Sequence, residues 1–399
     1  MKCDAVIFGG GVAGLWLLDE LLRKGCSAVL LESRALGSGQ TVASQGIIHG
    51  GLKYTLQGML TRSAANISEM PGLWRACLTG VRAPDLRQTR VRSESCYLWR
   101  TESLGSRIGM IGARFGLTVA PQALNELERP TLLKDCPGTV ALLEEQVISP
   151  QSLIENLQNL NFHQILHYDP EQGLELETTE RGEIARIVIS SANRCDLILE
   201  PEHVVLAAGA GNGLLRTRCG LASPKMQLRP LHMLMLRGNL PGLNGHCVDG
   251  AKTRVTITTD RDSLGRTVWQ VGGQIAELGV SLSRPELIEL GERELEAVIP
   301  GIDLTQAEWG SYRVDRAERV MHGGKRPESF QIVREGNIST VWPTKLVLAP
   351  VLAERIAASI VPRYIVDSDD WLEQPRPRVA LPPWEFPENW QVAALRRTA

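Results

Sequence analysis

The sequence predicts an α/β fold, in which a domain built on a parallel sheet is joined to a second, mostly antiparallel domain. The main observations come from the start of the chain. An apolar run at 4–9 ends in glycines and is typical of a buried parallel strand, and leucines at helical spacing predict a helix over 12–24. Gly25 is suited to end that helix, and the apolar run at 27–32 predicts a second strand. The order strand, helix, strand indicates a βαβ unit and therefore a parallel sheet.

The turn between the first strand and the helix has the pattern G-x-G-x-x-G, formed by Gly9, Gly11 and Gly14. In this pattern the first glycine permits a tight turn, the second lets a pyrophosphate approach the backbone, and the third allows the helix to pack closely on the strand. The helix that follows directs free N–H groups and the positive end of its dipole at the phosphates. Glu32 ends the second strand, where it can hydrogen-bond the ribose hydroxyls of an adenosine. We therefore predict a dinucleotide site, and Glu32 fits FAD or NAD equally well.

The remaining elements were predicted from the same periodicities. The three strands expected between residues 228 and 270 favour an antiparallel sheet in the middle of the chain. The tail from residue 367 is rich in Pro and Trp, so we expect it to wrap the surface in extended form. The predicted helices span 150–160, 285–299 and 346–360, and the predicted strands span 183–190, 196–199, 204–208, 228–236, 255–258 and 267–270.

Composition excludes several classes of protein. The chain has 399 residues with Lys+Arg 43 against Asp+Glu 45, and no basic stripe appears, which argues against a nucleic-acid partner. The eight cysteines are scattered without a CxxC pair, which is typical of reduced cysteines in a cytoplasmic protein. The strand at the N-terminus leaves no room for a signal peptide, and no apolar run is long enough to span a membrane. Peripheral contact of the Trp-bearing tail with a membrane face is compatible with these features, although packing of the tail on the body is favoured.

Four further segments resemble the D-amino-acid oxidase superfamily of FAD-dependent oxidoreductases, in the order in which that family has them. SQGIIHGGLKY at Ser44–Tyr54 looks like the loop next to the flavin, and VVLAAGAGN at Val204–Asn212 resembles the later strand whose glycine turn approaches FAD. EWGSYRVD at Glu308–Asp315 is similar to the strand with a substrate-facing arginine, and WPTKLVLAPVLAERI at Trp342–Ile356 resembles the segment that closes over the flavin. The loop is closest to those of FAD-dependent glycerol-3-phosphate dehydrogenases and 2-hydroxyglutarate oxidases.

The chain departs from these patterns at three places. Lys53 stands where the dehydrogenases usually have an arginine, and Pro343-Thr344 stands where they have a glycine pair. Tyr312-Arg313-Val314 replaces the Arg-Pro that D-amino-acid oxidase-like members usually carry. The resemblance therefore identifies the superfamily more securely than any single activity.

The resemblance implies FAD as the cofactor, held by the glycine turn, the end of the second strand, the flavin loop, the later glycine turn and the C-terminal segment. The implied cofactor-binding residues are Gly9, Gly11, Val12, Ala13, Gly14, Glu32, Ser33, Arg34, Ser44, Gln45, Gly46, Ile48, Gly209, Gly211, Thr344, Lys345 and Leu346. Whether FAD is attached covalently is left open, because some members of the superfamily do this through histidine or cysteine.

The candidate catalytic residues follow from the chemistry that a flavin leaves to the protein. Anionic substrates need fixed cations, and the resemblance implies Lys53, Arg313 and Lys345 for this role. A neutral imidazole can accept a hydroxyl proton near pH 7, which makes His49 and His232 the candidate bases. Each histidine could instead be structural.

Two further interpretations concern the rest of the site. Tyr54 is a candidate for the wall of the substrate pocket, and His322 is interpreted as a loop residue. The sequence contains no His/Cys/Asp/Glu cluster with metal-site spacing, no G-x-S-x-G and no Walker loop. We therefore predict no metal site.

The predicted architecture is an FAD-binding, Rossmann-like parallel-sheet domain with a mostly antiparallel substrate-binding domain. The FAD domain is expected from 1–85, 150–225 and 315–365, the substrate domain from 86–149 and 226–314, and the extended tail from 366–399. The site should lie above the carboxyl ends of the parallel strands, where the two domains meet.

The leading functional hypothesis is oxidation of a CH–OH group in a small anionic substrate, either a 2-hydroxy acid or a polyol phosphate. The alternative is oxidation of an amino acid or N-alkyl amino acid, which needs no histidine base. A third hypothesis is a flavin-binding accessory protein that docks RNA through five arginines between Arg82 and Arg100, although such residues more often form a solvated face. The electron acceptor, whether oxygen, a quinone or a partner protein, stays open, as does the oligomeric state.

Overall fold

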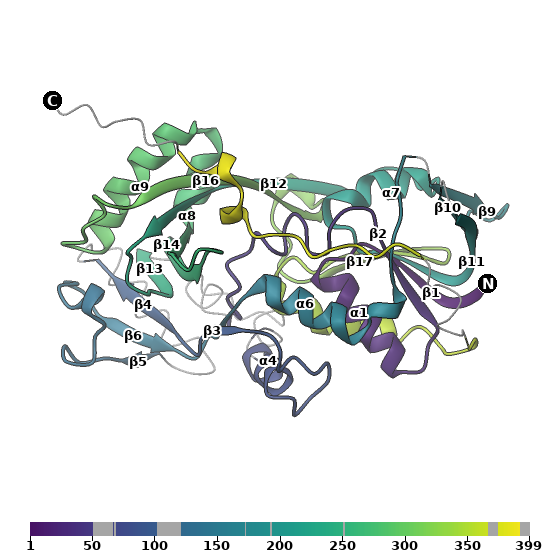
Figure 1. The fold of residues 1–399 in the computed structure, drawn as a ribbon, viewed down its shortest axis with the longest axis horizontal. Coiled ribbons are helices and arrows are strands. Elements are labelled where there is room, and N and C mark those ends of the chain that lie inside the picture. The colour runs from purple at the N-terminus through teal and green to yellow at the C-terminus, as the bar shows by residue number, and fades with distance from the viewer. Residues whose placement is uncertain are drawn as a thin grey trace.

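Two large sheets lie at opposite ends of the protein in the computed structural model (Figure 1). The structure describes residues 1–50, 67, 69–101, 121–171, 173–191, 194–249, 252–365 and 374–391. One sheet has the strand order β17-β18-β11-β1-β2-β8, with β10 and β9 added through β11, and the other has the order β16-β12-β15-β14-β13-β4-β6-β5. The mixed α/β architecture predicted from the sequence is therefore present.

The first sheet is parallel at its centre, as the βαβ pattern predicts. β1 (Lys2–Phe8) lies between β2 (Ala28–Glu32) and β11 (Arg194–Leu206), and it is parallel to both. β2 pairs in parallel with β8 (Ile165–His167), and β11 pairs in parallel with β18 (Ile338–Trp342). β1 and β2 are almost completely buried, which explains why they are continuous apolar runs without alternation.

β11 is one strand where the sequence predicted two. Its first part pairs antiparallel with β10 (Ile184–Ser191), which in turn pairs with β9 (Leu174–Thr178). Its second part, from Glu200 onward, pairs with β1. The apparent gap in the sequence around Pro201 marks the place where the strand changes partners, because proline cannot donate a ladder hydrogen bond.

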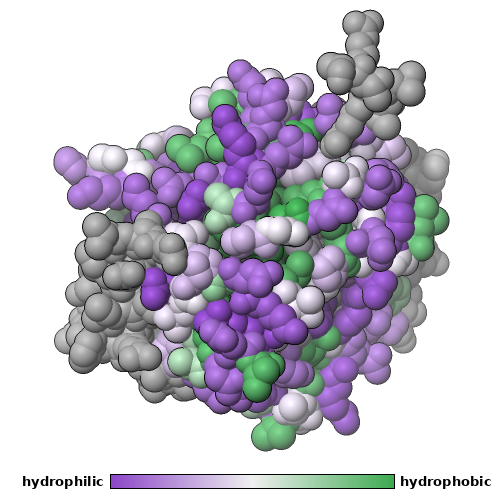
Figure 2. Space-filling view, turned by 90° about the vertical axis from the view of Figure 1, so that its left-hand side faces the viewer, coloured by the Kyte–Doolittle hydropathy of each residue, from purple (hydrophilic) through white to green (hydrophobic). Residues whose placement is uncertain are grey.

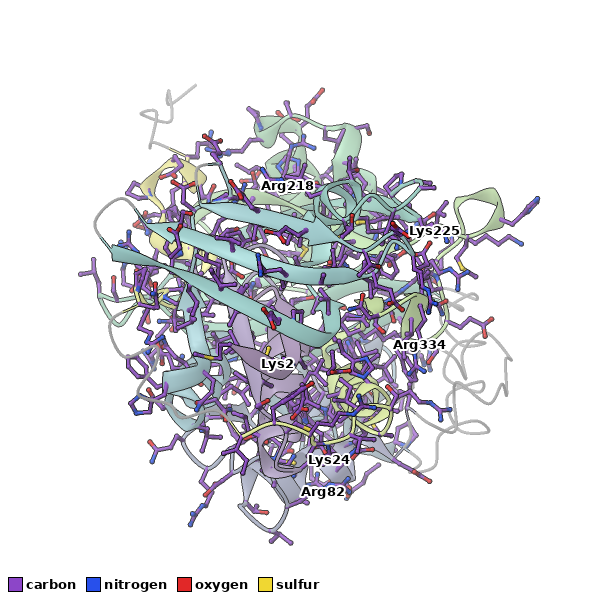
Figure 3. All side chains as sticks on the ribbon, turned by 90° about the vertical axis from the view of Figure 1, so that its right-hand side faces the viewer. Lys2, Lys24, Arg82, Arg218, Lys225 and Arg334 are labelled. Atoms are coloured by element: carbon purple, nitrogen blue, oxygen red, sulfur yellow. The ribbon has the colours of Figure 1, made fainter. Side chains whose placement is uncertain are left out.

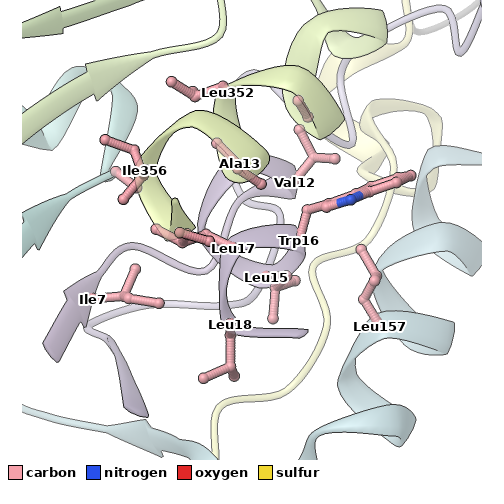
Figure 4. Packing of buried hydrophobic residues seen from close by; sticks show 14 of the residues in the cluster. Ile7, Val12, Ala13, Leu15, Trp16, Leu17, Leu18, Leu157, Leu352 and Ile356 are labelled. Atoms are coloured by element: carbon pink, nitrogen blue, oxygen red, sulfur yellow. The ribbon is translucent and has the colours of Figure 1, made fainter. Parts of the chain in front are cut away.

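The helix α1 (Val12–Arg23) is the centre of the core on one face of this sheet. It contacts both α6 (Pro150–Leu160) and α10 (Ala349–Ala357). Figure 4 shows Leu15, Trp16 and Leu17 of this helix surrounded by side chains of those neighbours. The predicted helix over 346–360 is divided into the 3-10 turn η6 (Leu346–Leu348) and α10, because Pro350 lacks an N–H and suits the first turn of an α-helix.

The second sheet is antiparallel except where β4 and β13 run in parallel. Its longest pair, β12 with β16, is joined over twelve registered residue pairs, from Met226↔Arg319 to Arg237↔Glu308. α9 (Arg284–Val298) covers one face and begins with a capping box between Ser283 and Glu286. The strands of this second sheet are β4 (Cys96–Arg100), β5 (Gln122–Ala123), β6 (Val140–Leu143), β12 (Met226–Gly238), β13 (Gly245–Asp249), β14 (Lys252–Arg261), β15 (Thr267–Gly272) and β16 (Glu308–Arg319). A separate two-stranded sheet is formed by β3 (Val91–Ser93) and β7 (Val147–Ile148).

The smaller elements complete the covering of both sheets. Antiparallel β17 lies beside β18 at one edge of the first sheet. These elements are β17 (Gln331–Glu335), the helices α4 (Met70–Leu78), α7 (Asn212–Arg218) and α8 (Gln274–Leu278), and the 3-10 turns η1 (Thr131–Leu133), η2 (Phe162–Gln164), η3 (Gly209–Gly211), η4 (Gly279–Ser281), η5 (His322–Gly324), η8 (Pro383–Glu385) and η9 (Pro387–Asn389).

We propose a division into two domains near the predicted boundaries, because each sheet has its own buried core. The boundary at 314/315 falls inside β16, however. Ala317 of that strand packs with Trp342 at the end of β18, so the β12–β16 pair reaches from one sheet to the other.

The tail crosses both sheets (Figure 1). Pro375 accepts a hydrogen bond from His167 N beside the first sheet, and Val379 bridges Leu36. At the other end, Trp390 bridges Gly310 of β16 and lies under the guanidinium of Arg237, 4.0 Å from the ring centre. The tail therefore links the two sheets.

Figures 2 and 3 show the two ends of the molecule. The face at the α9 end is mostly hydrophilic, with hydrophobic residues in small groups (Figure 2). At the opposite end, the labelled cations are spread out rather than gathered (Figure 3), and Arg82 and Lys225 form ion pairs with Glu354 and Glu335. No helix in the described ranges has the length and hydropathy needed to cross a bilayer.

We expect Trp390→Ala to lower the free energy of unfolding by about 3–5 kcal/mol, the usual cost of truncating a buried tryptophan. The ring is buried, and its Nε1 donates to the Trp384 carbonyl oxygen at 2.9 Å. Urea denaturation measures the loss. Leu381→Ala is the control, since Leu381 lies on the same tail with its side chain exposed. Equal, small effects of both variants would contradict the role of the tail as a structural link.

Candidate active site

A cleft of about 840 Å³ opens at the carboxyl ends of β1, β2 and β11. Its walls come from the glycine turn after β1, the end of β2, the segment 38–44, the turn after β11 and the segment 342–346. Tyr312 and Arg313 of β16 and Phe386 of the tail complete it. The cleft thus lies where the sequence predicted it, between the parallel sheet and the antiparallel one.

The glycine turn is shaped by contacts that exclude side chains. Gly9 has φ +110, and a Cβ at this position would lie 2.5 Å from Ala208 Cα. A Cβ on Gly14 would lie 2.0 Å from the Gly9 carbonyl oxygen, so α1 can approach β1 this closely only with glycine there. The backbone of the turn therefore forms part of the cleft wall, at the N-terminus of α1, where anions are favoured.

Glu32 is fixed at the end of β2 by two backbone donors. Its Oε2 accepts from Gly10 N at 2.6 Å, and its Oε1 accepts from Arg34 N at 2.8 Å. The residue also lines the cleft. These bonds hold the carboxylate beside the glycine turn, in the place expected for an acceptor of ribose hydroxyls.

The structure places most, but not all, of the predicted cofactor residues on the cleft wall. Five of the predicted residues do not line the cleft: Gly14, which lies behind the glycine turn, and Gln45, Gly46, Ile48 and Thr344. The predicted residues that line the cleft are Gly9, Gly11, Val12, Ala13, Glu32, Ser33, Arg34, Ser44, Gly209, Gly211, Lys345 and Leu346.

The loop that follows Ser44 is clamped between the two sheets. Gln45 Nε2 donates to the carbonyl oxygens of Thr256 and Gln270, at 3.1 and 3.0 Å. The main-chain carbonyl oxygen of Gln45 accepts a hydrogen bond from Arg92 Nη2. Nη1 of Arg92 forms an ion pair with Asp260 at 3.0 Å. Gln45 therefore fixes the loop on the antiparallel sheet and does not point into the cleft.

Thr344 explains one departure from the family pattern. Its φ of +60 is in the left-handed region that glycine normally occupies, although the residue is β-branched. The hydroxyl donates to the Pro343 carbonyl oxygen at 2.7 Å, and Lys345 N donates to the same oxygen. The chain thus adopts a glycine-like turn here without glycine, and Lys345 follows it on the cleft wall.

The histidine His49 lies in a cluster that the sequence did not reveal. Its Nδ1 is 3.5 Å from Glu145 Oε2, and Nε2 of His246 is also 3.5 Å from that oxygen. Burial lowers the pKa of the His49 imidazole, Glu145 acts in the opposite direction, and His246 and Lys345 lower the pKa further. His49 is therefore neutral near pH 7 and able to accept a proton.

The same cluster bears on the prediction of no metal site. The donor atoms of His49, Glu145 and His246 lie within 4.8 Å of one another, so these three side chains could hold a divalent transition metal. Glu145 and His246 were missed because they lie 96 and 197 positions from His49. No local motif signals their approach, which depends on the pairing of β13 beside β4 and β6.

His232, the second candidate base, is held by two hydrogen bonds. It is buried, with Nδ1 3.0 Å from the Gly279 carbonyl oxygen and Nε2 2.9 Å from Ser311 Oγ. Neither His232 nor His49 is among the residues that line the cleft described above. Both ring nitrogens are thus hydrogen-bonded, which fits the structural alternative for His232, and its role as a base stays a prediction.

Arg313 lines the cleft, but its guanidinium is hydrogen-bonded to backbone carbonyl oxygens. Nη1 donates to the Val280 carbonyl oxygen at 2.9 Å, and Nη2 donates to that of Leu282 at 2.8 Å. The side chain is exposed, so these bonds can be exchanged for an anion. Lys53 and Tyr54 lie outside the described residues, and His322 is in the exposed turn η5.

Comparisons with known proteins agree with this architecture. The model of the FAD dependent oxidoreductase family named DAO matches residues 4–341. A Pseudomonas aeruginosa protein named "Probable FAD-dependent oxidoreductase PA4991" is 40% identical over 394 residues, covering 96% of this chain and 98% of its own length. The crystal structure of the P. aeruginosa protein superimposes with a TM-score of 0.80 at 37% identity, covering 96% of this chain and 98% of that chain.

Two more distant solved structures share the fold. Glycine oxidase from Geobacillus kaustophilus has a TM-score of 0.65 at 17% identity, covering 93% of this chain and 98% of that one. L-α-glycerophosphate oxidase from Mycoplasma pneumoniae, with FAD bound, has a TM-score of 0.64 at 14% identity, covering 96% and 100%. At these identities the likeness concerns the fold alone.

The described residues fit FAD. The glycine backbone at the N-terminus of α1 suits a pyrophosphate, and the clamped carboxylate of Glu32 suits a ribose diol. The cleft volume of about 840 Å³ is in the range of cofactor sites.

We expect Gly14→Ala to lose most bound FAD and to lower the free energy of unfolding by about 1–3 kcal/mol, because the added methyl group overpacks the contact between α1 and Gly9. Flavin absorbance after gel filtration and urea denaturation measure the two effects.

Gly72→Ala is the matched control, since a Cβ on this α4 glycine would meet no atom within 4 Å. This control should be neutral or slightly stabilising. Wild-type flavin content in Gly14→Ala would contradict the close-packing argument.

Proposed function

Since the chain belongs to the DAO family of FAD-dependent oxidoreductases, we propose that it oxidises a CH–OH group of a small anionic substrate, a 2-hydroxy acid or a polyol phosphate. The observation that carries this proposal is the half-buried imidazole of His49, whose Nδ1 lies 3.5 Å from Glu145 Oε2. An alcohol must lose its hydroxyl proton as its C–H hydride leaves, so it needs a base of this kind. When bound, FAD supplies the acceptor for that hydride.

We propose that the cofactor-binding residues named above hold FAD along the cleft. The pyrophosphate would face the turn Gly9–Gly14, the adenosine ribose would meet Glu32, and the flavin end would lie toward Ser44 and Lys345. Residues of all of these segments line the cleft. Lys345 also acts electrostatically on His49, so the two side chains are near each other.

The anionic substrate is proposed from the cations on this side of the cleft. Lys345 and Arg313 line the cleft wall, and either could pair with a carboxylate or phosphate. Lys53 remains part of the proposal from its place in the HGGLKY loop. Amine oxidation, the activity named for the glycine oxidase neighbour, is the alternative that the first experiment separates.

We further propose a cytoplasmic location. The seven cysteines described by the structure are buried and unpaired, which is usual in a reducing compartment. Membrane contact through the tail has little support from Trp384 and Trp390, because both are buried against the body. Reoxidation of the reduced enzyme by oxygen, by a soluble quinone or by neither identifies the class of electron acceptor.

The proposal is tested by mixing the purified yellow protein anaerobically with 2-hydroxy acids, glycerol phosphates and amino acids. Bleaching of the flavin absorbance by a hydroxylated anion is expected. Bleaching by amino acids, with none by any hydroxylated anion, would replace the proposal with amine oxidation.

With a substrate in hand, we expect His49→Asn to slow flavin reduction by about 100- to 10,000-fold, the usual contribution of a general base. Stopped-flow absorbance measures this rate. His322→Asn is the control, because His322 is exposed in η5 and should leave the rate unchanged. A His49→Asn variant with the wild-type rate would remove His49 from the chemistry.

A further inference from the structure

Glu145 is a buried carboxylate placed between two imidazoles. Its side chain is 5% exposed, and the ring centres of His49 and His246 are 5.6 Å apart at an interplanar angle of 34°. Glu145 Oε2 has no hydrogen bond within standard limits in the described part of the chain, and the imidazole nitrogens at 3.5 Å are its ion-pair neighbours. A buried acceptor in this state needs N–H donors aimed at it.

The surrounding contacts determine which atoms can be donors. Glu145 Oε1 accepts from Gly50 N at 2.7 Å, which fixes the rotation of the carboxylate and directs Oε2 at the imidazoles. Nδ1 of His246 is 3.0 Å from Thr256 Oγ1. If that hydroxyl donates to Nδ1, then Nε2 of His246 carries a proton and donates to Glu145.

The charges around the cluster favour an ionised Glu145. Burial raises its pKa, but the two imidazoles outweigh burial and hold the pKa well below the usual range. Burial and the charge of Glu145 raise the pKa of the buried Cys96 thiol well above normal, so this thiol stays neutral. Lys345 is the further charged group that acts on His49.

We propose that Glu145 is a positioning residue that keeps Nδ1 of His49 protonated, so that Nε2 is the atom that accepts the substrate proton, while His246 keeps Glu145 ionised and in place. This inference rests on the proposed function. In the reaction the substrate O–H bond breaks and its proton moves to His49 Nε2. The C–H electron pair leaves as hydride to the oxidised flavin, and the carbonyl bond forms. Glu145 then faces an imidazolium and stabilises its charge.

The contact with Gly50 makes Glu145→Gln a sharp test. Because Gly50 N–H requires an acceptor, the amide oxygen takes the place of Oε1, and the amide NH₂ group is turned toward the imidazoles. That group donates where Oε2 accepted, so it reverses the tautomer of His49 and moves the proton to Nε2.

The experiment combines NMR of the resting enzyme, which needs no substrate, with stopped-flow measurement of flavin reduction by substrate. In ¹⁵N-histidine NMR of the holoenzyme, with His49 assigned by loss of its signals in His49→Asn, the wild type should show Nδ1 protonated and Nε2 bare. Glu145→Gln should show the reverse. In stopped-flow reduction the same variant should lose about 100- to 10,000-fold in rate, with substrate Kd within about threefold, and Glu145→Asp should recover much of the rate.

Retention of the yellow cofactor reports that each variant is folded. Should Glu145→Gln fail to fold, Thr256→Val offers a milder change, because it removes the hydroxyl next to His246 Nδ1. It is expected to shift the His246 signals and to reduce the rate by a few-fold.

The outcomes separate the two proposals. Unchanged His49 tautomer in Glu145→Gln would overturn the positioning role, as would a tightly bound transition metal that is present in the wild type and lost in this variant. A third outcome is the expected change of the His49 tautomer together with no bleaching of the flavin by any CH–OH substrate. It would support the positioning role of Glu145 and reject the proposed substrate class.

Discussion

The close approach of backbones at the end of β1 is the constraint on which the rest of the structure depends. Gly9 packs against Ala208 after β11, and Gly14 packs against the Gly9 carbonyl oxygen, at distances that leave no space for a Cβ. These contacts bring α1 down onto the sheet and bury its leucines. They also leave the N-terminus of α1 open at the cleft, where a pyrophosphate is stabilised by N–H groups. The packing of the core and the proposed binding of FAD therefore use the same glycines.

The second sheet contributes to the site by holding loops that the first sheet cannot hold. Gln45 is tied to β14 and β15, and Tyr312 of β16 donates to the Ala43 carbonyl oxygen at 2.7 Å. Arg92 and Asp260 add a buried ion pair behind the same loop. These contacts hold the segment that precedes His49 on the antiparallel sheet. A strained turn at Thr344 positions Lys345 on the other side.

The chemistry proposed for the site depends on fixed proton positions more than on charge alone. In the group formed by Glu145, His49 and His246, Gly50 N meets one carboxylate oxygen, the two imidazoles lie beside the other, and Thr256 meets the second imidazole. Buried polar groups of this kind are rigid when their partners are complete. Such rigidity suits a base that must be ready before substrate binds.

The sequence by itself determined the parts of the protein that local pattern controls. The glycine turn, the buried strands around it, Glu32 and the helices predicted over 150–160 and 285–299 follow from periodicity and from residues with special backbone or capping properties. It could not show that β11 is continuous through Pro201, because the change of partners there is a property of the sheet. Nor could it distinguish His232 from His49, since each is a histidine near apolar residues. Only the tertiary structure surrounds one with hydrogen-bond partners and sets the other beside Glu145 and His246. Periodicity reports which face of an element is buried, whereas the meeting of distant side chains depends on strand order and register, which are set by packing across the whole chain.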